Sequence, residues 1–350
     1  MNFSSEIVRW YNINKRDLPW RNTQNPYFIW LSEIILQQTR VAQGMSYYIK
    51  FVSTFPTIQK LAKASEDEVL KLWQGLGYYS RARNLHFTAK EITQKYKGKF
   101  PQDFVEIKKL KGIGDYTAAA IASFAFDKPH AVVDGNVYRV LARVFDIKTA
   151  IDSSQGKKEF AALAEELLDK KKPALHNQAI MEFGAVQCVP QNPDCNSCCL
   201  NSICIAKQKK WVSELPVKEK KLLQRNRYFN YFIIHQNKNI FIHQRGAKDI
   251  WQGLFEFPLI ETETDTSAKK LMLSDEWIFF FANEEITIQK VSDYHKHILS
   301  HQILNARFWE IDAGKSKLKN IKKKFQKIKH NQLNTFALPR LIDKVMNPKK

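Results

Sequence analysis

The sequence predicts a multidomain protein in which an all-α domain precedes an α+β domain. Residues 1–207 carry apolar side chains at helical spacing, with short connections marked by glycine and proline. From residue 227 the pattern changes to short runs rich in β-branched and aromatic residues, which is typical of strands. All five cysteines lie between residues 188 and 204, at the end of the helical part. We therefore expect two domains and a cysteine-rich loop.

The expected elements follow in chain order. Helical patterns, which we expect to form about ten helices, cover 25–52, 65–76, 82–96, 115–126, 135–145, 157–170 and 174–188. A charged segment with weak periodicity, 208–226, is expected to be a linker. Strand patterns cover 228–235, 239–245, 254–260, 277–282, 286–291 and 306–311. We place the second domain at 227–312 and treat the lysine-rich segment 313–350 as a basic C-terminal tail.

Charge and composition limit the partners. The chain has 55 Lys and Arg against 35 Asp and Glu, a formal net charge of +20, which favours binding to a phosphate backbone. The N-terminus lacks the apolar run of an export signal. No segment approaches the roughly 18–20 uninterrupted apolar residues of a membrane span. We expect a soluble, cytoplasmic monomer with no membrane partner, associated with the nucleoid if the source is bacterial.

Four cysteines have the spacing C-x6-C-x2-C-x5-C, namely Cys188, Cys195, Cys198 and Cys204. In a reducing compartment such a group indicates a metal site more often than disulfides. A structural zinc site usually has two close pairs separated by a longer loop. One short continuous loop suits a [4Fe–4S] cluster better, so the spacing favours the cluster over zinc. Cys199 fits no ligand position.

The stretch "LKGIGDYTAAA" places Gly112 and Gly114 in a tight turn that opens a helix. Glycines let the backbone approach a ligand closely, and a helix N-terminus presents free N–H groups to an anion. The pattern, at about 105–125, is that of a helix-hairpin-helix, which grips a DNA phosphate without reading the base sequence.

The order of this hairpin, "AVVDGNVYRVLAR" and the cysteine loop resembles that of the endonuclease III superfamily of DNA glycosylases. The stretches "LPWR", "WLSEIILQQTRVA", "GLGYYSRARNLH" and "GLFEFP" resemble its MutY-type, adenine-specific branch. The resemblance implies a helical glycosylase domain with a [4Fe–4S] cluster and a C-terminal Nudix-like domain. It also implies removal of adenine paired with 8-oxoguanine or guanine in double-stranded DNA.

Two carboxyl groups match the chemistry of adenine excision. The leaving base must be protonated, and the positive charge that develops on the sugar must be stabilised. Glu33 lies in "FIWLSEIIL", a helix that is apolar on nearly every side, so burial should raise its pKa. Asp134 precedes Gly135 at a helix start, where it could also be an ordinary N-cap. The resemblance makes Glu33 the acid and Asp134 the stabilising carboxylate.

The resemblance assigns further roles around the extruded base. Tyr116 stands where bifunctional relatives carry a lysine that forms a Schiff base. A phenol cannot do so, and we therefore expect a monofunctional enzyme. The side chains expected to open the DNA double helix or to line the adenine pocket are Arg21, Gln37, Gln38, Tyr78 and Gln178.

In the second domain, Leu299, Ser300 and His301 match a Phe-Ser-His triplet that probes 8-oxoguanine in MutY-type relatives. The Ser300 hydroxyl can both donate and accept at the oxidised edge of the base. The Mg²⁺-binding acidic motif of Nudix hydrolases is missing, so a binding module is expected. Two alternatives stay open: a pyrimidine-lesion glycosylase with lyase activity, and a non-catalytic, metal-stabilised DNA-binding protein.

Overall fold

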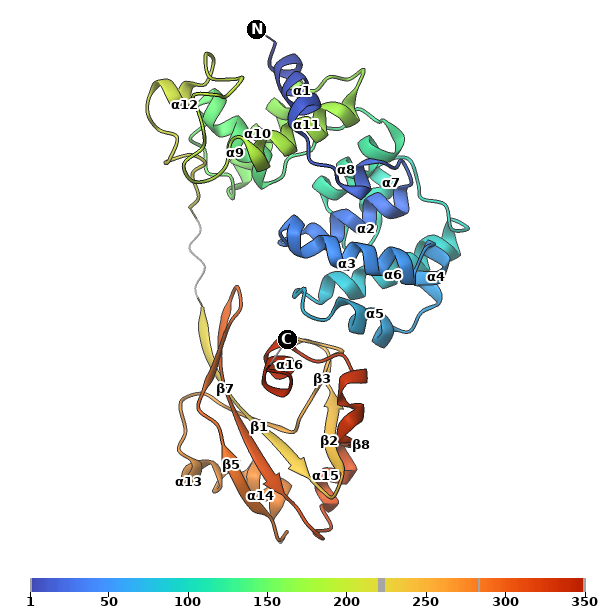
Figure 1. The fold of residues 1–350 in the computed structure, drawn as a ribbon, viewed down its shortest axis with the longest axis vertical. Coiled ribbons are helices and arrows are strands. Elements are labelled where there is room, and N and C mark those ends of the chain that lie inside the picture. Colours follow the sequence, from blue (N-terminus) through green and yellow to red (C-terminus); the bar gives the residue numbers. More distant parts are fainter. Residues whose placement is uncertain (1, 220–223, 283, 349–350) are drawn as a thin grey trace. The chain divides into compact units, whose positions relative to one another are not determined.

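A computed structural model describes residues 2–219, 224–282 and 284–348. The chain forms two compact units, the first from Met1–Lys63 and Asn84–Lys220, the second from Ala64–Arg83 and Lys221–Lys350 (Figure 1). The expected division at residue 207 therefore misses 64–83, which belong with the second unit. Of the expected linker 208–226, residues 220–223 lie outside the described residues.

Helices make up the first unit. They are α1 (Phe3–Asn14), α2 (Pro26–Leu36), α3 (Val41–Thr54), α4 (Ile58–Lys63), α7 (Phe104–Lys109), α8 (Asp115–Phe126), α9 (Gly135–Phe145), α10 (Ser154–Leu167), α11 (Pro173–Val186), α12 (Ile205–Gln208) and the short 3-10 helix η1 (Pro19–Arg21). Helix α6 (Ser80–Lys95) begins in the second unit's segment and continues in the first. The single pattern at 25–52 forms two helices, because the turn at 37–40 separates α2 from α3.

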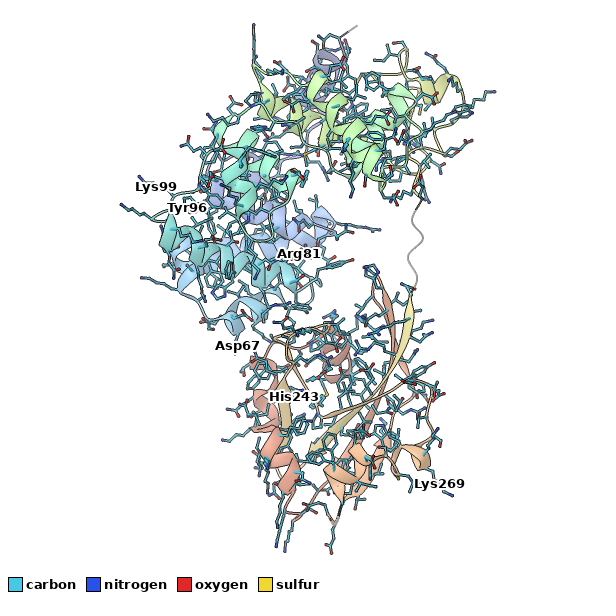
Figure 2. The ribbon with its side chains drawn as sticks, turned by 180° about the vertical axis from the view of Figure 1, so that it is seen from behind. Asp67, Arg81, Tyr96, Lys99, His243 and Lys269 are labelled. Carbon is cyan, nitrogen blue, oxygen red and sulfur yellow. The ribbon has the colours of Figure 1, made fainter. Side chains whose placement is uncertain are left out.

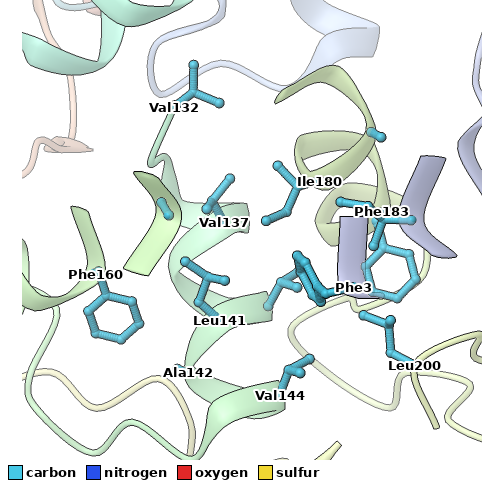
Figure 3. Packing of buried hydrophobic residues seen from close by; sticks show 14 of the residues in the cluster. Phe3, Val132, Val137, Leu141, Ala142, Val144, Phe160, Ile180, Phe183 and Leu200 are labelled. Atoms are coloured by element: carbon cyan, nitrogen blue, oxygen red, sulfur yellow. The ribbon is translucent and has the colours of Figure 1, made fainter. Parts of the chain in front are cut away.

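One hydrophobic cluster joins α1, α9 and α11 (Figure 3). Leu141 and Val144 of α9 and Phe183 of α11 are buried in it. Trp10 meets Phe183 edge to face, with ring centroids 5.1 Å apart. Because α9 and α11 both pack into this cluster, the N-terminal end of α9 and the C-terminal end of α11 are held in fixed positions.

The second unit is built on two sheets. Their strands are β1 (Arg225–His235), β2 (Asn239–Gln244), β3 (Phe255–Glu256), β4 (Leu259–Thr262), β5 (Thr287–Val291), β6 (His295–Ile298), β7 (Gln302–Asp312) and β8 (Gln326–Lys329). One sheet has the order β4-β1-β7-β5, with β6 also paired to β7, and the other has the order β3-β2-β8. Strands β1 and β7 run parallel. The helices of this unit are α5 (Glu66–Trp73), α13 (Ala268–Leu271), α14 (Asp275–Phe281), α15 (Lys319–Lys324) and α16 (Arg340–Met346), with the 3-10 helix η2 (His330–Thr335).

The segment 313–350, expected to be a basic tail, is part of this fold. Strand β8 pairs with β2 through Ile328 and Ile240, and Leu318, Ile321 and Phe325 are buried against α14 and the larger sheet. Apolar residues at spacings of three and four thus enter the core, while the lysines between them stay outside. The boundary at 312 is corrected accordingly. Exposed lysines are spread over both units, as Lys99 and Lys269 illustrate (Figure 2).

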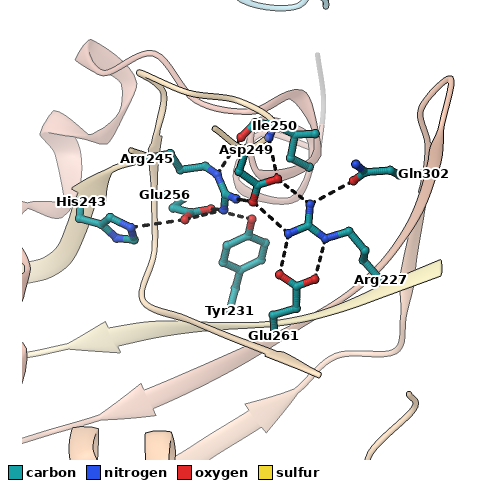
Figure 4. A network of polar contacts seen from close by, with 9 residues as sticks. All are labelled: Arg227, Tyr231, His243, Arg245, Asp249, Ile250, Glu256, Glu261 and Gln302. Carbon is teal, nitrogen blue, oxygen red and sulfur yellow. Dashed lines mark hydrogen bonds and ion pairs between the residues drawn. The ribbon is translucent and has the colours of Figure 1, made fainter. Parts of the chain in front are cut away.

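A charge network with two buried arginines joins β1, β3 and β4 to the loop before β3 (Figure 4). Arg227 donates to Asp249 and to Glu261, and Arg245 donates to Glu256 and Asp249. The Tyr231 hydroxyl donates to Glu256 over 2.9 Å. The two guanidinium groups thus pair with all three carboxylates, and these ion pairs hold the loop between β2 and β3 in place.

Among the helices formed by the described residues, none combines the length and apolar character that a membrane crossing needs.

Candidate active site

A cavity of about 670 Å³ opens in the first unit between α2, α8, α9 and α11. Seven of the residues singled out from the sequence line it, namely Arg21, Glu33, Gln37, Gln38, Tyr116, Asp134 and Gln178. They come from segments up to 157 residues apart (Arg21 to Gln178), which the core around α9 and α11 brings together. Tyr78, Gly112 and Gly114 do not line this cavity.

Glu33 is the buried acid of the cavity. Helix α2 is buried on nearly every side, and Glu33 is only 7% exposed. The pKa of Glu33 is raised to about 7, mainly by burial; a hydrogen bond from Tyr116 and the charge of Arg21 oppose the shift, and the charge of Asp134 adds to it. The Tyr116 hydroxyl donates to Glu33 Oε2 over 2.6 Å. Near neutral pH this carboxyl group can therefore hold a proton and give it to a bound base.

Asp134 is both a helix cap and a site residue. It is the N-cap of α9, and its Oδ1 accepts from the backbone amides of Asn136 and Val137, each over 2.8 Å. Its Oδ2 accepts from Asn136 Nδ2 over 2.8 Å. Burial raises the pKa of Asp134, and these hydrogen bonds oppose the rise because they favour the charged form. Asp134 thus accepts three hydrogen bonds that favour its charged form, whereas Glu33 accepts one, from Tyr116.

Arg21 is held by a carboxylate that the sequence did not reveal. Glu182 of α11 has no exposed side-chain surface and accepts from Arg21 Nη2 over 2.6 Å and from three donors of Arg16. The Arg21 guanidinium lies 5.6 Å from the ring centre of Tyr11, whose hydroxyl donates to Gln178. Arg21 and Gln178 are thus fixed on one side of the cavity by the same scaffold.

Glu182→Gln should destabilise the first unit. The pKa of Glu182 is lowered to about 2 by the hydrogen bonds from Arg16 and Arg21, which outweigh its burial. Removing one charge of a buried pair leaves the other uncompensated, and we expect a loss of about 2 kcal/mol or more in the free energy of unfolding by urea at pH 7. Because the carboxylate pKa is depressed, the difference from wild type should shrink as the pH falls below 4.5 toward 2.

Glu106→Gln, which removes an exposed ion pair with Lys109, is the matched control. Exposed pairs contribute little, so the control should change stability far less. If the two variants lower the free energy of unfolding equally, the buried ion pairs of Glu182 contribute no more to stability than an exposed ion pair does.

Two expected base-opening residues have unusual backbones. Gln38, just after α2, has φ 56°, and Tyr78 has φ 48°, both in the left-handed region that non-glycine residues seldom occupy. Gln37 ends α2 and its Nε2 donates to Thr117 over 3.3 Å. Tyr78 is half exposed, which excludes an ordinary core aromatic. Such strained positions often occur at functional sites.

The expected helix-hairpin-helix is formed by α7, a turn and α8. Gly112 has φ 81°, and a Cβ at this position would come within 2.8 Å of Asn84 Cβ, so both conformation and space require glycine. Gly114 is the N-cap of α8, and no atom lies within 4 Å of a Cβ placed there. The space beside Gly114 is therefore open at the start of α8, and a helix start is where backbone amides can bind an anion.

The cysteine loop packs on α9. Four thiols, those of Cys188, Cys195, Cys198 and Cys204, line a small cavity that Cys199 does not line. Arg143 donates to Cys188 Sγ over 3.4 Å and to Val189 O over 2.8 Å. Within the described residues, no three His, Cys, Asp or Glu side chains converge on one metal ion. Sulfurs that surround a space suit a cluster, in which each thiolate binds a different iron.

The triplet Leu299–His301 forms the turn between β6 and β7. Leu299 N donates to Gln302 O over 2.8 Å, which closes the hairpin. Within the second unit, the Ser300 and Tyr78 hydroxyls lie 2.5 Å apart. His301 is exposed. The triplet therefore presents polar groups at a loop tip.

Sequence reasoning missed Glu182, Asn136 and Arg139, all of which line the active-site cavity. A signal existed for Glu182, since an acidic residue in the apolar run "AIMEFGAV" resembles Glu33 in its own helix. Arg139 donates to Asn136 Oδ1 over 2.9 Å and to Cys188 O over 2.7 Å, a link that only the fold reveals.

A helical unit with a helix-hairpin-helix, and a cavity that holds the two buried carboxyl groups of Glu33 and Asp134, are typical of a base-excision DNA glycosylase. The model of the HhH-GPD superfamily of base excision DNA repair proteins matches residues 31–170, and the NUDIX domain model matches 230–347. The second range includes most of the segment 313–350, so it agrees with the fold in placing this segment in the second domain.

The adenine DNA glycosylase of Buchnera aphidicola subsp. Baizongia pistaciae is 38% identical over 86% of this chain and 84% of its own length. That of Rattus norvegicus is 44% identical over 59% of this chain and 42% of its own. A thermostable thymine-DNA glycosylase structure is 32% identical, with a TM-score of 0.55, over 59% of this chain and 95% of its own. The chain belongs to the MutY-type adenine DNA glycosylases, and it is an adenine-specific enzyme of base-excision repair.

Proposed function

We propose that the enzyme hydrolyses the N-glycosidic bond of adenine paired with 8-oxoguanine or guanine in duplex DNA. The contact that carries this proposal is the 2.6 Å hydrogen bond between Tyr116 and Glu33 in a cavity shared with Asp134. Glu33 protonates the flipped adenine, and Asp134 stabilises the positive charge on the sugar. Arg21 and Gln178 contact the base from the opposite wall.

We further propose that excision occurs without strand cleavage. A lyase reaction needs an amine that attacks the sugar. Tyr116, at the position of the lyase lysine in bifunctional relatives, offers only a phenol whose pKa is raised well above its ordinary value by burial and by Glu33. Water is then the final nucleophile.

One experiment tests both proposals. Purified enzyme is incubated with duplexes that carry adenine opposite 8-oxoguanine, guanine, cytosine or thymine. Each reaction is divided, and one half is treated with alkali. We expect strand breaks only after alkali, and mainly opposite 8-oxoguanine and guanine. Breaks without alkali would support the lyase alternative, and binding without any base release would support a non-catalytic DNA-binding protein.

We also propose that Cys188, Cys195, Cys198 and Cys204 hold a [4Fe–4S] cluster. The four thiols line one cavity, and the Arg143 guanidinium beside Cys188 suits a negatively charged thiolate. When bound, the cluster would supply cross-links between α11, the loop and α12. No basic side chain lies between Cys188 and Cys204, so we assign phosphate contacts nearby to backbone amides or to Lys207, Lys209 and Lys210.

The neighbouring cysteines 198 and 199 offer a matched pair of variants. Cys198→Ala should abolish iron and acid-labile sulfide in the purified protein, together with its visible absorbance, because one of four ligands is lost. Cys199→Ala should retain them, since its thiol lies outside the cavity and faces the Glu6 carbonyl 3.8 Å away. A colourless wild-type protein that contains zinc would refute the cluster.

For the base opposite adenine, we propose that Ser300 and His301 read 8-oxoguanine. The double variant Ser300→Ala with His301→Ala should lower the preference for adenine opposite 8-oxoguanine over adenine opposite guanine by several-fold, as the loss of a hydrogen bond of about 1 kcal/mol implies. The measurement is the ratio of single-turnover rates on the two duplexes. Leu299→Phe should raise this ratio or leave it unchanged. A double variant that discriminates like wild type would place the reading site elsewhere.

A further inference from the structure

The turn between α7 and α8 rests on one face of α6, within the first unit. Asn84, Phe87 and Thr88 form this face, because spacings of three and four residues lie on one side of a helix. The buried Thr88 hydroxyl donates to the carbonyl of Lys111 over 2.8 Å, and Asn84 lies directly against Gly112. The backbone of Lys111 is therefore held in place by α6.

Three lysines lie in and next to this turn, and acidic side chains neutralise two of them. Lys108 forms an ion pair with Asp115, and Lys109 forms one with Glu106 over 2.6 Å. Of the residues that the structure describes, no carboxylate forms an ion pair with Lys111. Lys111 thus carries positive charge at the turn that no acidic side chain compensates.

The partner of the Lys111 ammonium is an aromatic ring. Its Nζ lies 4.4 Å from the ring centre of Phe87, which is half exposed and is therefore no ordinary core residue. An ammonium is attracted to the face of such a ring, and this contact limits the rotamers of a long and flexible side chain. The ring covers one side of the ammonium, and N–H groups on the other sides remain able to donate.

The place of Lys111 gives this arrangement a use. Lys111 directly precedes Gly112 and lies three residues before Gly114, the N-cap of α8. Backbone amides at a helix start bind a phosphate through dipoles. An ammonium group also neutralises a phosphate charge and releases a counterion from DNA. Lys111 can therefore add to the turn a charge that the backbone does not supply.

We propose that Lys111 binds a backbone phosphate of duplex DNA beside the start of α8, and that Phe87 is the positioning residue that holds its ammonium. The ligand is a phosphodiester group, so the contact is independent of base sequence. Neither residue lines the active-site cavity, so the contact contributes to affinity and not to bond cleavage. The proposal rests on duplex DNA as the substrate, but not on which base lies opposite adenine.

Variants of the full-length protein separate charge from position. Lys111→Met removes the charge but keeps an apolar stem against Phe87. Lys109→Met is the matched control, because it removes the same charge where Glu106 already pairs with it. Lys111→Arg keeps the charge, and a guanidinium also stacks on rings and binds phosphate. Phe87→Leu removes only the ring, and the double variant joins Phe87→Leu to Lys111→Met.

The measurement is the affinity of each protein for an undamaged duplex, by fluorescence anisotropy over a series of salt concentrations. Lys111→Met should weaken binding several-fold at low salt. It should also reduce the slope of the logarithm of the binding constant against the logarithm of salt concentration by about 0.9, the value for one phosphate contact. Lys109→Met should keep the wild-type slope, and Lys111→Arg should restore it.

Phe87→Leu should keep the wild-type slope and weaken binding about two- to fivefold, as expected for an exposed cation–π contact. Because Phe87 acts through Lys111, the double variant should bind no more weakly than Lys111→Met alone. Thermal unfolding followed by circular dichroism checks that each variant is folded.

Equal slopes for Lys111→Met and Lys109→Met would show that Lys111 makes no phosphate contact. If the effects of Phe87→Leu and Lys111→Met add in the double variant, the ring does not act through the lysine and its positioning role is wrong. A wild-type protein that does not bind the duplex would refute the proposed function as well, whereas a failure confined to Lys111→Met refutes this contact alone.

Discussion

Glu33→Gln should lose at least about 10²-fold in the single-turnover rate of adenine release, the contribution typical of general acid catalysis. Glutamine keeps the size and polarity of the side chain but has no acidic proton to give. DNA affinity should stay within a few-fold of wild type, because protonation of the base acts in the transition state. Anisotropy titrations and single-turnover kinetics on one duplex separate the two effects.

The pH dependence of the wild-type rate is the internal check. Glu33 must be protonated to act, and its pKa is about 7, so the rate should be level below that pH and should fall above it. Tyr116→Phe removes a hydrogen bond that lowers this pKa, so the fall should move to higher pH. Near-normal excision by Glu33→Gln, or a rate that rises through pH 7–8, would exclude Glu33 as the acid.

Asp134→Asn should lose about 10²–10³-fold in the same rate, the range seen when one electrostatic stabiliser of a transition state is removed. Asparagine is as good an N-cap as aspartate, so α9 should keep its start and the loss should come from the missing charge. The rate on adenine opposite 8-oxoguanine and the far-ultraviolet circular dichroism spectrum together make this distinction.

Asp169→Asn is the control for Asp134→Asn. The Asp169 side chain also accepts a hydrogen bond from a backbone amide, that of Lys171, but it lies outside the cavity. It should excise adenine like wild type. If Asp134→Asn retains full activity with an intact spectrum, Asp134 is only a cap.

Much of the fold could be predicted because periodicity reports burial. The apolar stretch around Glu33 predicts a helix buried on nearly every side and therefore a raised pKa for Glu33. The structure confirms both. The prediction of a basic tail at 313–350 is wrong, because the many lysines of the segment dominate its composition. Leu318, Ile321 and Phe325 lie among these lysines at helical spacing and enter the core.

Only those site residues that stand in a short sequence motif could be predicted from the sequence. Asp134 and Gly112 stand in short motifs whose geometry is set by neighbouring residues. The anchor of Arg21 is a different case, because Glu182 lies 161 residues further along the chain and no local pattern joins them.

The burial of Glu33 also links folding to proton uptake. An ordinary glutamate has a pKa of 4.5 and gives up its proton well below pH 7, whereas the folded chain holds that proton up to about pH 7. The stability that this proton contributes is complete below 4.5 and is lost as the pH rises through 7, at up to about 1.4 kcal/mol per pH unit. The loss falls between pH 4.5 and about 7 and is complete just above 7. The acid that enables excision therefore makes the first unit less stable at neutral pH than in mild acid.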